Sequence, residues 1–90
     1  MATVQFTSNL KRFYPELAKI HVTALTVANL LDEIEQQFPG LRNYIVDDQH
    51  RLRHHVNIFI NNSMIKDRDS LSDPIAEADS VYIMQALSGG

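Results

Sequence analysis

The chain has 90 residues, of which 44% are hydrophobic and 21% charged, and its formal net charge is −3. This is enough for one domain with a single core, and too little for a core and an enclosed catalytic cavity together. The 11 acidic and 8 basic residues disfavour a protein that binds nucleic acid, which would normally present a basic face. The absence of cysteine excludes disulfides, thiolate metal sites and cysteine nucleophiles.

No apolar run approaches the length of a membrane span, about 18 residues or more. The first residues also lack the basic start and the apolar stretch of a secretory signal. We therefore expect a cytoplasmic protein that does not act at a membrane.

The first quarter of the chain predicts two strands. Apolar and polar residues alternate over residues 2–7, which places Val4 and Phe6 on one buried face. Residues 8–16 include serine, asparagine, lysine, arginine and Pro15, so we expect a turn there. Leu17, Ile20 and Val22 predict a short second strand that forms a hairpin with the first.

A helix is predicted over residues 27–38. Its apolar positions form one stripe at helical spacing, and acidic and amide side chains cover the other side. Thr26 is suited to cap the N-terminus, and Pro39-Gly40 ends the helix. The stripe consists of Val27, Leu30, Leu31, Ile34 and Phe38.

The second half predicts a short helical turn on the core over residues 41–46, a loop at 47–49 and three strands. One strand spans residues 54–61, a return strand begins at Met64-Ile65 after the turn signal Asn61-Asn62, and the last strand spans 80–86. A polar connection covers residues 66–80. Alternation directs Val56, Ile58, Ile60, Val81 and Ile83 inward and leaves Phe59, Met64, Tyr82 and Met84 on or near the opposite face.

The histidines and charged clusters do not predict a catalytic or metal site. His54 and His55 are adjacent on the predicted strand and so point to opposite faces, and neither HExxH spacing nor cysteine is present. A small basic cluster near Arg42 consists of Arg51, Arg53 and the two histidines. This cluster either meets an acidic surface of a partner or balances the charges of Asp47 and Asp48. Solvated charge is the simpler interpretation. The helix carboxylates are expected to form an exposed polar face.

The terminal Gly89-Gly90 is the most informative feature, because the chain has only one other glycine, Gly40. Residues without Cβ let a backbone enter a narrow channel and leave the terminal carbonyl carbon open to attack. The pair is therefore typical of a tail whose terminal carboxylate reacts. The alternative is an end without a function.

Three segments resemble a known family: Phe38-Pro39-Gly40-Leu41-Arg42, the strand Val56–Asn61, and Asp79–Ile83 followed by Ala86-Leu87-Ser88-Gly89-Gly90. With the predicted order β-β-α-β-β-β, the chain resembles ubiquitin-like sulfur carriers of the MoaD/ThiS type, most of all the branch that serves cysteine synthesis. The resemblance implies an α+β, β-grasp fold in which a mixed sheet of four to five strands packs on one main helix. Residues 1–86 would form the domain and residues 87–90 a flexible tail.

The resemblance also implies a mechanism. An E1-like enzyme would use ATP to adenylate Gly90, and a sulfur donor would convert it to a thiocarboxylate that a synthase consumes. Leu87, Ser88 and Gly89 would thread into the enzymes, and Phe59, Met64, Tyr82 and Met84 would form the docking surface. The carrier would contribute no catalytic residue, metal or cofactor, and its sulfur acceptor would be cysteine synthase or the large subunit of molybdopterin synthase.

Two positions depart from the family pattern, and two other functions stay open. Asn62 and Ala78 stand where relatives usually have glycine; asparagine tolerates the left-handed region, whereas Ala78 favours a type I turn. The chain could instead be a ubiquitin-like modifier that is joined to lysines through Gly90. It could also be an interaction domain whose tail is irrelevant.

Overall fold

A computed structural model describes residues 1–12 and 14–85, apart from the side chain of Asn9. Five strands form one mixed sheet in the order β2-β1-β5-β3-β4. The central strands β1 and β5 run parallel, and every other neighbouring pair is antiparallel. The elements are β1 (Ala2–Phe6), α1 (Ser8–Lys11), β2 (Ile20–Val22), α2 (Val27–Gln37), α3 (Arg42–Ile45), β3 (Val56–Ile60), β4 (Ser63–Met64) and β5 (Ser80–Gln85).

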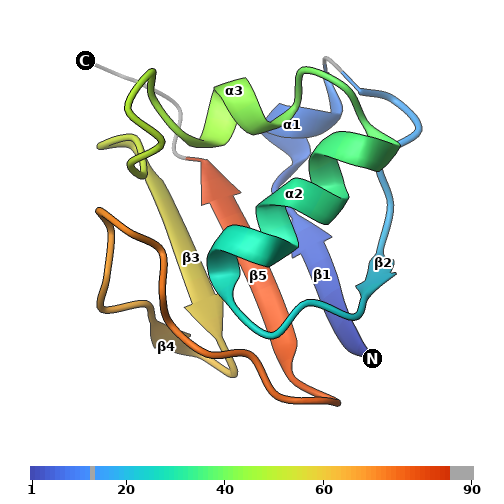
Figure 1. The fold of residues 1–90 in the computed structure, drawn as a ribbon. Coiled ribbons are helices and arrows are strands. Elements are labelled where there is room, and N and C mark those ends of the chain that lie inside the picture. Colours follow the sequence, from blue (N-terminus) through green and yellow to red (C-terminus); the bar gives the residue numbers. More distant parts are fainter. Residues whose placement is uncertain (13, 86–90) are drawn as a thin grey trace.

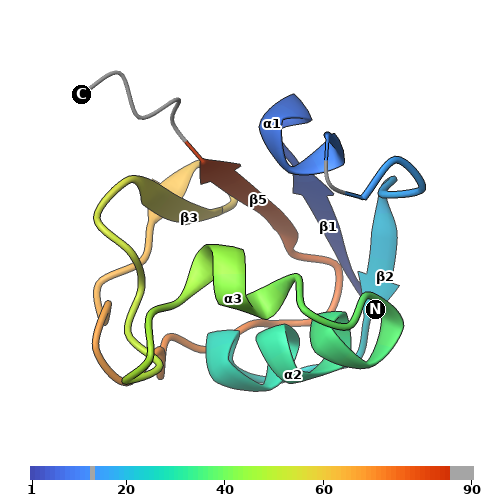
Figure 2. The same cartoon turned by 90° about the horizontal axis from the view of Figure 1, so that it is seen from above.

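Helix α2 crosses one face of the sheet, and α3 lies beside it on the same side (Figures 1 and 2). Neither α2 nor α3 covers the other face, and we call it the open face. This arrangement confirms the predicted α+β architecture, with a five-stranded mixed sheet packed on one main helix. No helix in the described ranges is long and apolar enough to cross a bilayer.

Helix α2 forms as its sequence predicts. The Thr26 hydroxyl accepts a hydrogen bond from the Asn29 N–H at 3.2 Å, which satisfies one of the free donors of the first turn. The apolar stripe is buried except at its last position: Val27, Leu30 and Ile34 are each 0% exposed, and Phe38 is half-buried. The helix ends at Gln37, one residue before the predicted end, and the N–H of Phe38 closes the last turn on the Ile34 carbonyl.

The core lies between α2 and the sheet. The inward residues of the three central strands are buried, and they alternate with exposed or half-buried residues along each strand. Burying one such aliphatic side chain stabilises the fold by about 1.5–3 kcal/mol. These core residues are Val4, Phe6, Val56, Ile58, Val81 and Ile83.

The segment 8–16 was predicted as a turn, and this prediction is partly wrong, because it contains the one-turn helix α1. Leu10 is fully buried, and its N–H donates to the Thr7 carbonyl. The spacing of Leu10, Phe13 and Tyr14 is compatible with a helical turn, but the polar residues and Pro15 of this segment favoured a turn instead. Leu17, predicted in the second strand, is buried but precedes β2.

The third strand begins later than predicted. Residues 54 and 55 form a turn, which is closed by a hydrogen bond from the Val56 N–H to the Arg53 carbonyl at 3.1 Å. His54 and His55 are therefore not strand residues on opposite faces. The return strand β4 is likewise shifted, to Ser63–Met64.

Two turns use left-handed backbone. Asn61 and Asn62 have φ of 51° and 74°, the pattern of a two-residue type I′ hairpin. Ala78 also has a positive φ, 74°, so the predicted type I turn is wrong. The Asp79 carboxylate holds this turn, because it accepts hydrogen bonds from the Ala76 N–H at 2.8 Å and the Asn61 side chain at 2.7 Å.

Carboxylates also order the long connection between β4 and β5. Asp67 accepts hydrogen bonds from the backbone N–H groups of Asp69, Ser70 and Ser72 and from the Ser72 hydroxyl. The Ser72 hydroxyl and these N–H groups lower the pKa of Asp67 from 3.8 to about 2. Leu71 and Ile75 are buried and attach this segment to the core.

Candidate functional site

Strand β5 leads the chain to the predicted reactive tail. It lies between β1 and β3, and its last residue, Gln85, is opposite Val56. The backbone N–H of Gln85 donates to the Thr7 hydroxyl at 3.2 Å, and its side-chain amide lies 3.5 Å from the Tyr44 carbonyl oxygen. The predicted tail residues Leu87, Ser88, Gly89 and Gly90 lie outside the described residues.

The structure brings the four predicted docking residues onto the open face. Phe59 is opposite Met64 of β4 on one side and Tyr82 of β5 on the other, so the three side chains form a row across the sheet. Met84 follows Tyr82 by two residues and so shares this face. We call Phe59, Met64, Tyr82 and Met84 the open-face patch.

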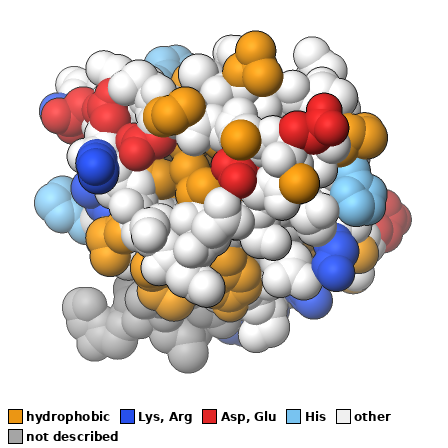
Figure 3. All heavy atoms as spheres, turned by 90° about the horizontal axis from the view of Figure 1, so that it is seen from below, with side chains coloured by type: hydrophobic (Ala, Val, Ile, Leu, Met, Phe, Trp, Pro, Cys, Tyr) orange, Lys and Arg blue, Asp and Glu red, His pale blue; other side chains and the backbone are white. Residues whose placement is uncertain are grey.

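The members of the patch differ in exposure. Met64 is 52% exposed and Tyr82 38% exposed, whereas Phe59 and Met84 are half-buried. Figure 3 shows hydrophobic side chains gathered at the lower edge of the view, on the side away from α2 and α3. Apolar side chains that cluster on an open surface are typical of a surface that contacts another protein.

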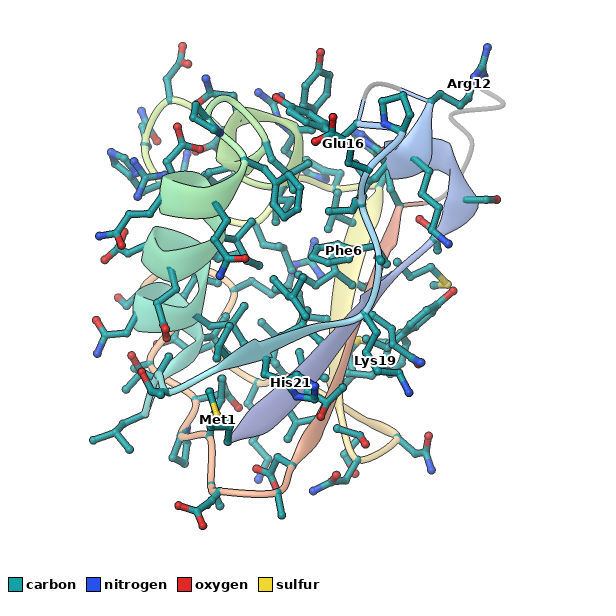
Figure 4. All side chains as sticks on the ribbon, turned by 90° about the vertical axis from the view of Figure 1, so that its right-hand side faces the viewer. Met1, Phe6, Arg12, Glu16, Lys19 and His21 are labelled. Atoms are coloured by element: carbon teal, nitrogen blue, oxygen red, sulfur yellow. The ribbon has the colours of Figure 1, made fainter. Side chains whose placement is uncertain are left out.

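Polar groups border the patch. Gln5 lies opposite Tyr82, and an open hollow runs from there past Phe59 to Asn61, Asn62 and Ser80. Lys19, directly before the outer strand β2, and His21 within β2 lie on the side of the sheet away from α2 (Figure 4). An aromatic and methionine centre with a polar border is the usual anatomy of a protein-binding surface.

The carboxylates of α2 have structural partners. Asp32 forms an ion pair with Arg42, and Glu33 accepts hydrogen bonds from the N–H and hydroxyl of Thr23. Glu35 accepts from the N–H groups of Gly40 and Arg42 at 2.9 and 3.1 Å, and these hydrogen bonds lower its pKa. These contacts fix the end of α2 and its connections to the neighbouring segments.

The basic cluster is tied to neighbouring groups as well. Arg51 lies 3.8 Å from the Asp47 carboxylate, and Arg53 donates to the Asn43 carbonyl at 2.9 Å. Asp47 also accepts from the N–H groups of Gln49 and Arg51, and its pKa is lowered. Within residues 1–12 and 14–85, no group of three or more histidine, aspartate or glutamate side chains is placed to hold a metal ion.

Comparison with known proteins identifies the family. Residues 4–90 match the ThiS family. The chain belongs to this family. As a ThiS-family protein it is similar to the sulfur carrier protein CysO of Mycobacterium tuberculosis, with 28% identity over 67 residues that cover 72% of each chain.

Solved structures confirm the ubiquitin-like β-grasp fold of this ThiS-family chain. The crystal structure of the BexX/CysO complex of Amycolatopsis orientalis matches with a TM-score of 0.86 and 20% identity, over 100% of both chains. CysO of M. tuberculosis matches with a TM-score of 0.83 and 22% identity, over 97% of this chain and 100% of the other. SAMP1 of Haloferax volcanii matches with a TM-score of 0.77 and 21% identity, over 99% of this chain and 98% of the other.

The predicted resemblance to MoaD/ThiS-type sulfur carriers is therefore confirmed. The roles of the tail and of the open-face patch stay predictions. Sequence reasoning did not find the contacts of Gln85 with Thr7 and Tyr44, because these residues are 78 and 41 positions away along the chain. No short-range pattern signals such contacts.

Proposed function

We propose that this protein is a sulfur carrier whose C-terminal Gly90 is activated and then loaded with sulfur. The observation that carries the proposal is the match to the ThiS family, which extends through Gly90 and so includes the terminal Gly-Gly. The lack of cysteine fits this role, because a carrier without a thiol must bind sulfur at an acyl carbon.

The chemistry has two steps. A carboxylate oxygen of Gly90 attacks the α-phosphorus of ATP, a new P–O bond forms, and pyrophosphate leaves. A sulfur nucleophile at the oxidation level of hydrosulfide then attacks the acyl carbon of the adenylate, a C–S bond forms, and AMP leaves. The product is a Gly90 thiocarboxylate, and no electron transfer is needed.

The folded body acts as the recognition element. An E1-like enzyme binds ATP and contributes the catalytic groups, and the carrier itself binds no cofactor. The open-face patch docks this enzyme, while Leu87, Ser88 and Gly89 carry the terminal carboxylate into its active site. The patch supports this division because its side chains lie on the face opposite the core.

A synthase then takes the sulfur. The similarity to proteins named CysO favours cysteine synthesis over molybdopterin synthesis as the pathway served. We place the reaction in the cytoplasm, where activating enzymes have ATP.

Mass spectrometry tests the proposal. The chain is incubated with ATP, a sulfide source and an E1-like adenylating enzyme, and the intact mass is measured. Replacement of one oxygen of the C-terminal fragment by sulfur is the expected result. A matched variant that lacks Gly90 should show no change, and an unmodified mass for the wild-type chain with every enzyme tried would contradict the proposal.

A second function is favoured by the likeness to SAMP1, the small archaeal modifier protein 1 of H. volcanii. In that case the activated Gly90 would form an isopeptide bond with a lysine amine of a target. The first step is the same and only the final nucleophile differs. Lysine-linked conjugates in the native source, without a thiocarboxylate form, would favour the modifier over the carrier.

A further inference from the structure

The backbone N–H of Gln85, the last residue of β5, donates to a side-chain hydroxyl where a regular strand ladder would offer it a backbone carbonyl. In a parallel ladder, one residue donates its N–H to the neighbouring strand and accepts from the N–H two positions further along that strand. Thr7 directly follows Phe6, which pairs with Ile83 of β5. The Thr7 N–H donates to the Ile83 carbonyl at 3.1 Å. By this pattern, the Thr7 carbonyl would accept the N–H of Gln85.

The Thr7 carbonyl is already used. It accepts a hydrogen bond from the Leu10 N–H at 3.2 Å as the chain turns from β1 into α1. The Thr7 hydroxyl accepts the N–H of Gln85 instead, also at 3.2 Å. One threonine therefore allows β1 to end while the pairing of β5 continues by one more residue.

We infer that Thr7 is a positioning residue that sets where the reactive tail leaves the sheet. The inference rests on the proposed function, in which residues 86–90 must carry the Gly90 carboxylate into a partner enzyme. Five residues reach about 18 Å at most, at about 3.6 Å per fully extended residue. The hydrogen bond between Thr7 and Gln85 fixes the starting point of the tail relative to the open-face patch, which lies on the same sheet.

Loss of the hydroxyl would remove the hydrogen bond that holds Gln85 to β1, while the pairing of Gln85 with Val56 and the contact of its side chain with Tyr44 would remain. The start of the tail would then be less firmly held when the partner takes it up, and the loss of one such hydrogen bond corresponds to an engagement weaker by as much as about tenfold. The cost falls on binding and not on the chemical step. The KM for the carrier should therefore rise, while kcat stays within about twofold of the wild-type value.

Thr7→Val tests this inference, because it removes the hydroxyl and keeps the shape of the side chain. Thr7→Ser keeps the hydroxyl and should restore the wild-type KM. Thr3→Val is the matched control: Thr3 lies in β1, which ends directly before Thr7, and the Thr3 hydroxyl is 3.3 Å from Nδ1 of His21, at the far end of β1 from Gln85. With pyrophosphate release as the assay, we expect the KM for the carrier to be about tenfold higher for Thr7→Val than for the wild-type chain. Thr7→Ser and Thr3→Val should keep the wild-type KM.

Amide hydrogen exchange of Gln85 gives a readout that needs no enzyme. The Gln85 amide should be protected in the wild-type chain and in Thr7→Ser, and should exchange faster in Thr7→Val, while the amide of Ile65, bonded to Ile58 at the other side of the sheet, stays protected. A KM within twofold of wild type for folded Thr7→Val, or an equal rise for Thr3→Val, would overturn the inference.

The two proposals can fail separately. If the wild-type chain is not adenylated by any enzyme, the proposed function fails whatever the exchange data show. If the wild-type chain is adenylated but its Gln85 amide is unprotected, the positioning role of Thr7 fails and the proposed function stands. This second measurement remains decisive even where Thr7→Val does not fold.

Discussion

Gly40→Ala should destabilise the protein through a contact that joins two distant segments. Gly40 has a φ of 93°, and a Cβ placed there would lie 2.8 Å from the Tyr14 hydroxyl oxygen. That hydroxyl donates to the Pro39 carbonyl at 3.0 Å. An alanine at position 40 would therefore strain the backbone and displace the hydroxyl from its acceptor.

The magnitude follows from three effects. An L-residue in the left-handed region costs about 1–2 kcal/mol. Loss of the Tyr14 hydrogen bond costs about 0.5–1.5 kcal/mol. Alanine also restricts the unfolded chain, which offsets about 0.4–1 kcal/mol. The free energy of unfolding should therefore fall by about 2 kcal/mol, and the Tm by roughly 8–16 °C for a domain of this size.

A double-mutant cycle with Tyr14→Phe separates the clash from the strain. Phenylalanine keeps the edge-to-face contacts of the ring with Phe38 and Tyr44, at centroid distances of 6.3 and 6.1 Å, and lacks the hydroxyl. In this background, Gly40→Ala should cost only about 1 kcal/mol, so the two changes should be coupled by about 1 kcal/mol.

Urea denaturation followed by far-UV circular dichroism measures all four proteins, because the chain has no tryptophan for fluorescence. The reasoning is refuted if Gly40→Ala costs less than about 0.5 kcal/mol, or if the two substitutions are additive.

Three further predictions concern the open face, a turn and the acid limit of stability. Met64→Asp should weaken capture of the activating enzyme at least tenfold and leave the Tm close to that of the wild-type chain. Leu25→Asp is the control, because Leu25 is 71% exposed and lies outside the patch, and it should not weaken capture. Equal effects of the two substitutions in pull-downs would contradict docking through the patch. Ala78→Gly should raise the free energy of unfolding by about 0.5 kcal/mol, because glycine adopts the φ of 74° without strain, and a loss of stability in urea would argue against this. The pKa of Asp67 is lowered from 3.8 to about 2, so the ionised carboxylate stabilises the fold above pH 3.8, and this stabilisation is lost as the pH falls toward 2. Asp67→Asn should therefore have a lower free energy of unfolding than the wild-type chain at pH 7 and approach the wild-type value near pH 2. A difference in the free energy of unfolding that does not change with pH would refute the assignment.

The parts of the fold that follow a period could be predicted from the sequence. Helix α2 and the inward faces of β3 and β5 each repeat an apolar position several times, so one exception does not hide the pattern. The same alternation identified the four residues of the open-face patch. Helix α1 was not found in this way, because its four residues include one apolar side chain, Leu10, and are too few to repeat a position.

Backbone conformation and long-range hydrogen bonds were harder to predict than burial. Ala78 adopts a positive φ against its intrinsic preference because the Asp79 carboxylate and backbone close the turn around it. Such tertiary contacts override local preference, and they are visible only once the chain is folded. The bond between Thr7 and Gln85 is of the same kind, since the parallel pairing of β1 and β5 brings together the two ends of the sequence.

Strand β5 connects the three parts of the proposed function. Val81 and Ile83 fix it in the core, Tyr82 and Met84 contribute to the open-face patch, and Gln85 begins the path to Gly90. Because β5 pairs with β1 on one side and β3 on the other, a shift of its register by one residue would break both ladders and expose the two core residues. The distance from the patch to the start of the tail is therefore as fixed as the core itself. A partner that binds the patch would receive the terminal carboxylate at a defined reach, which is why the hold on Gln85 should affect KM rather than kcat.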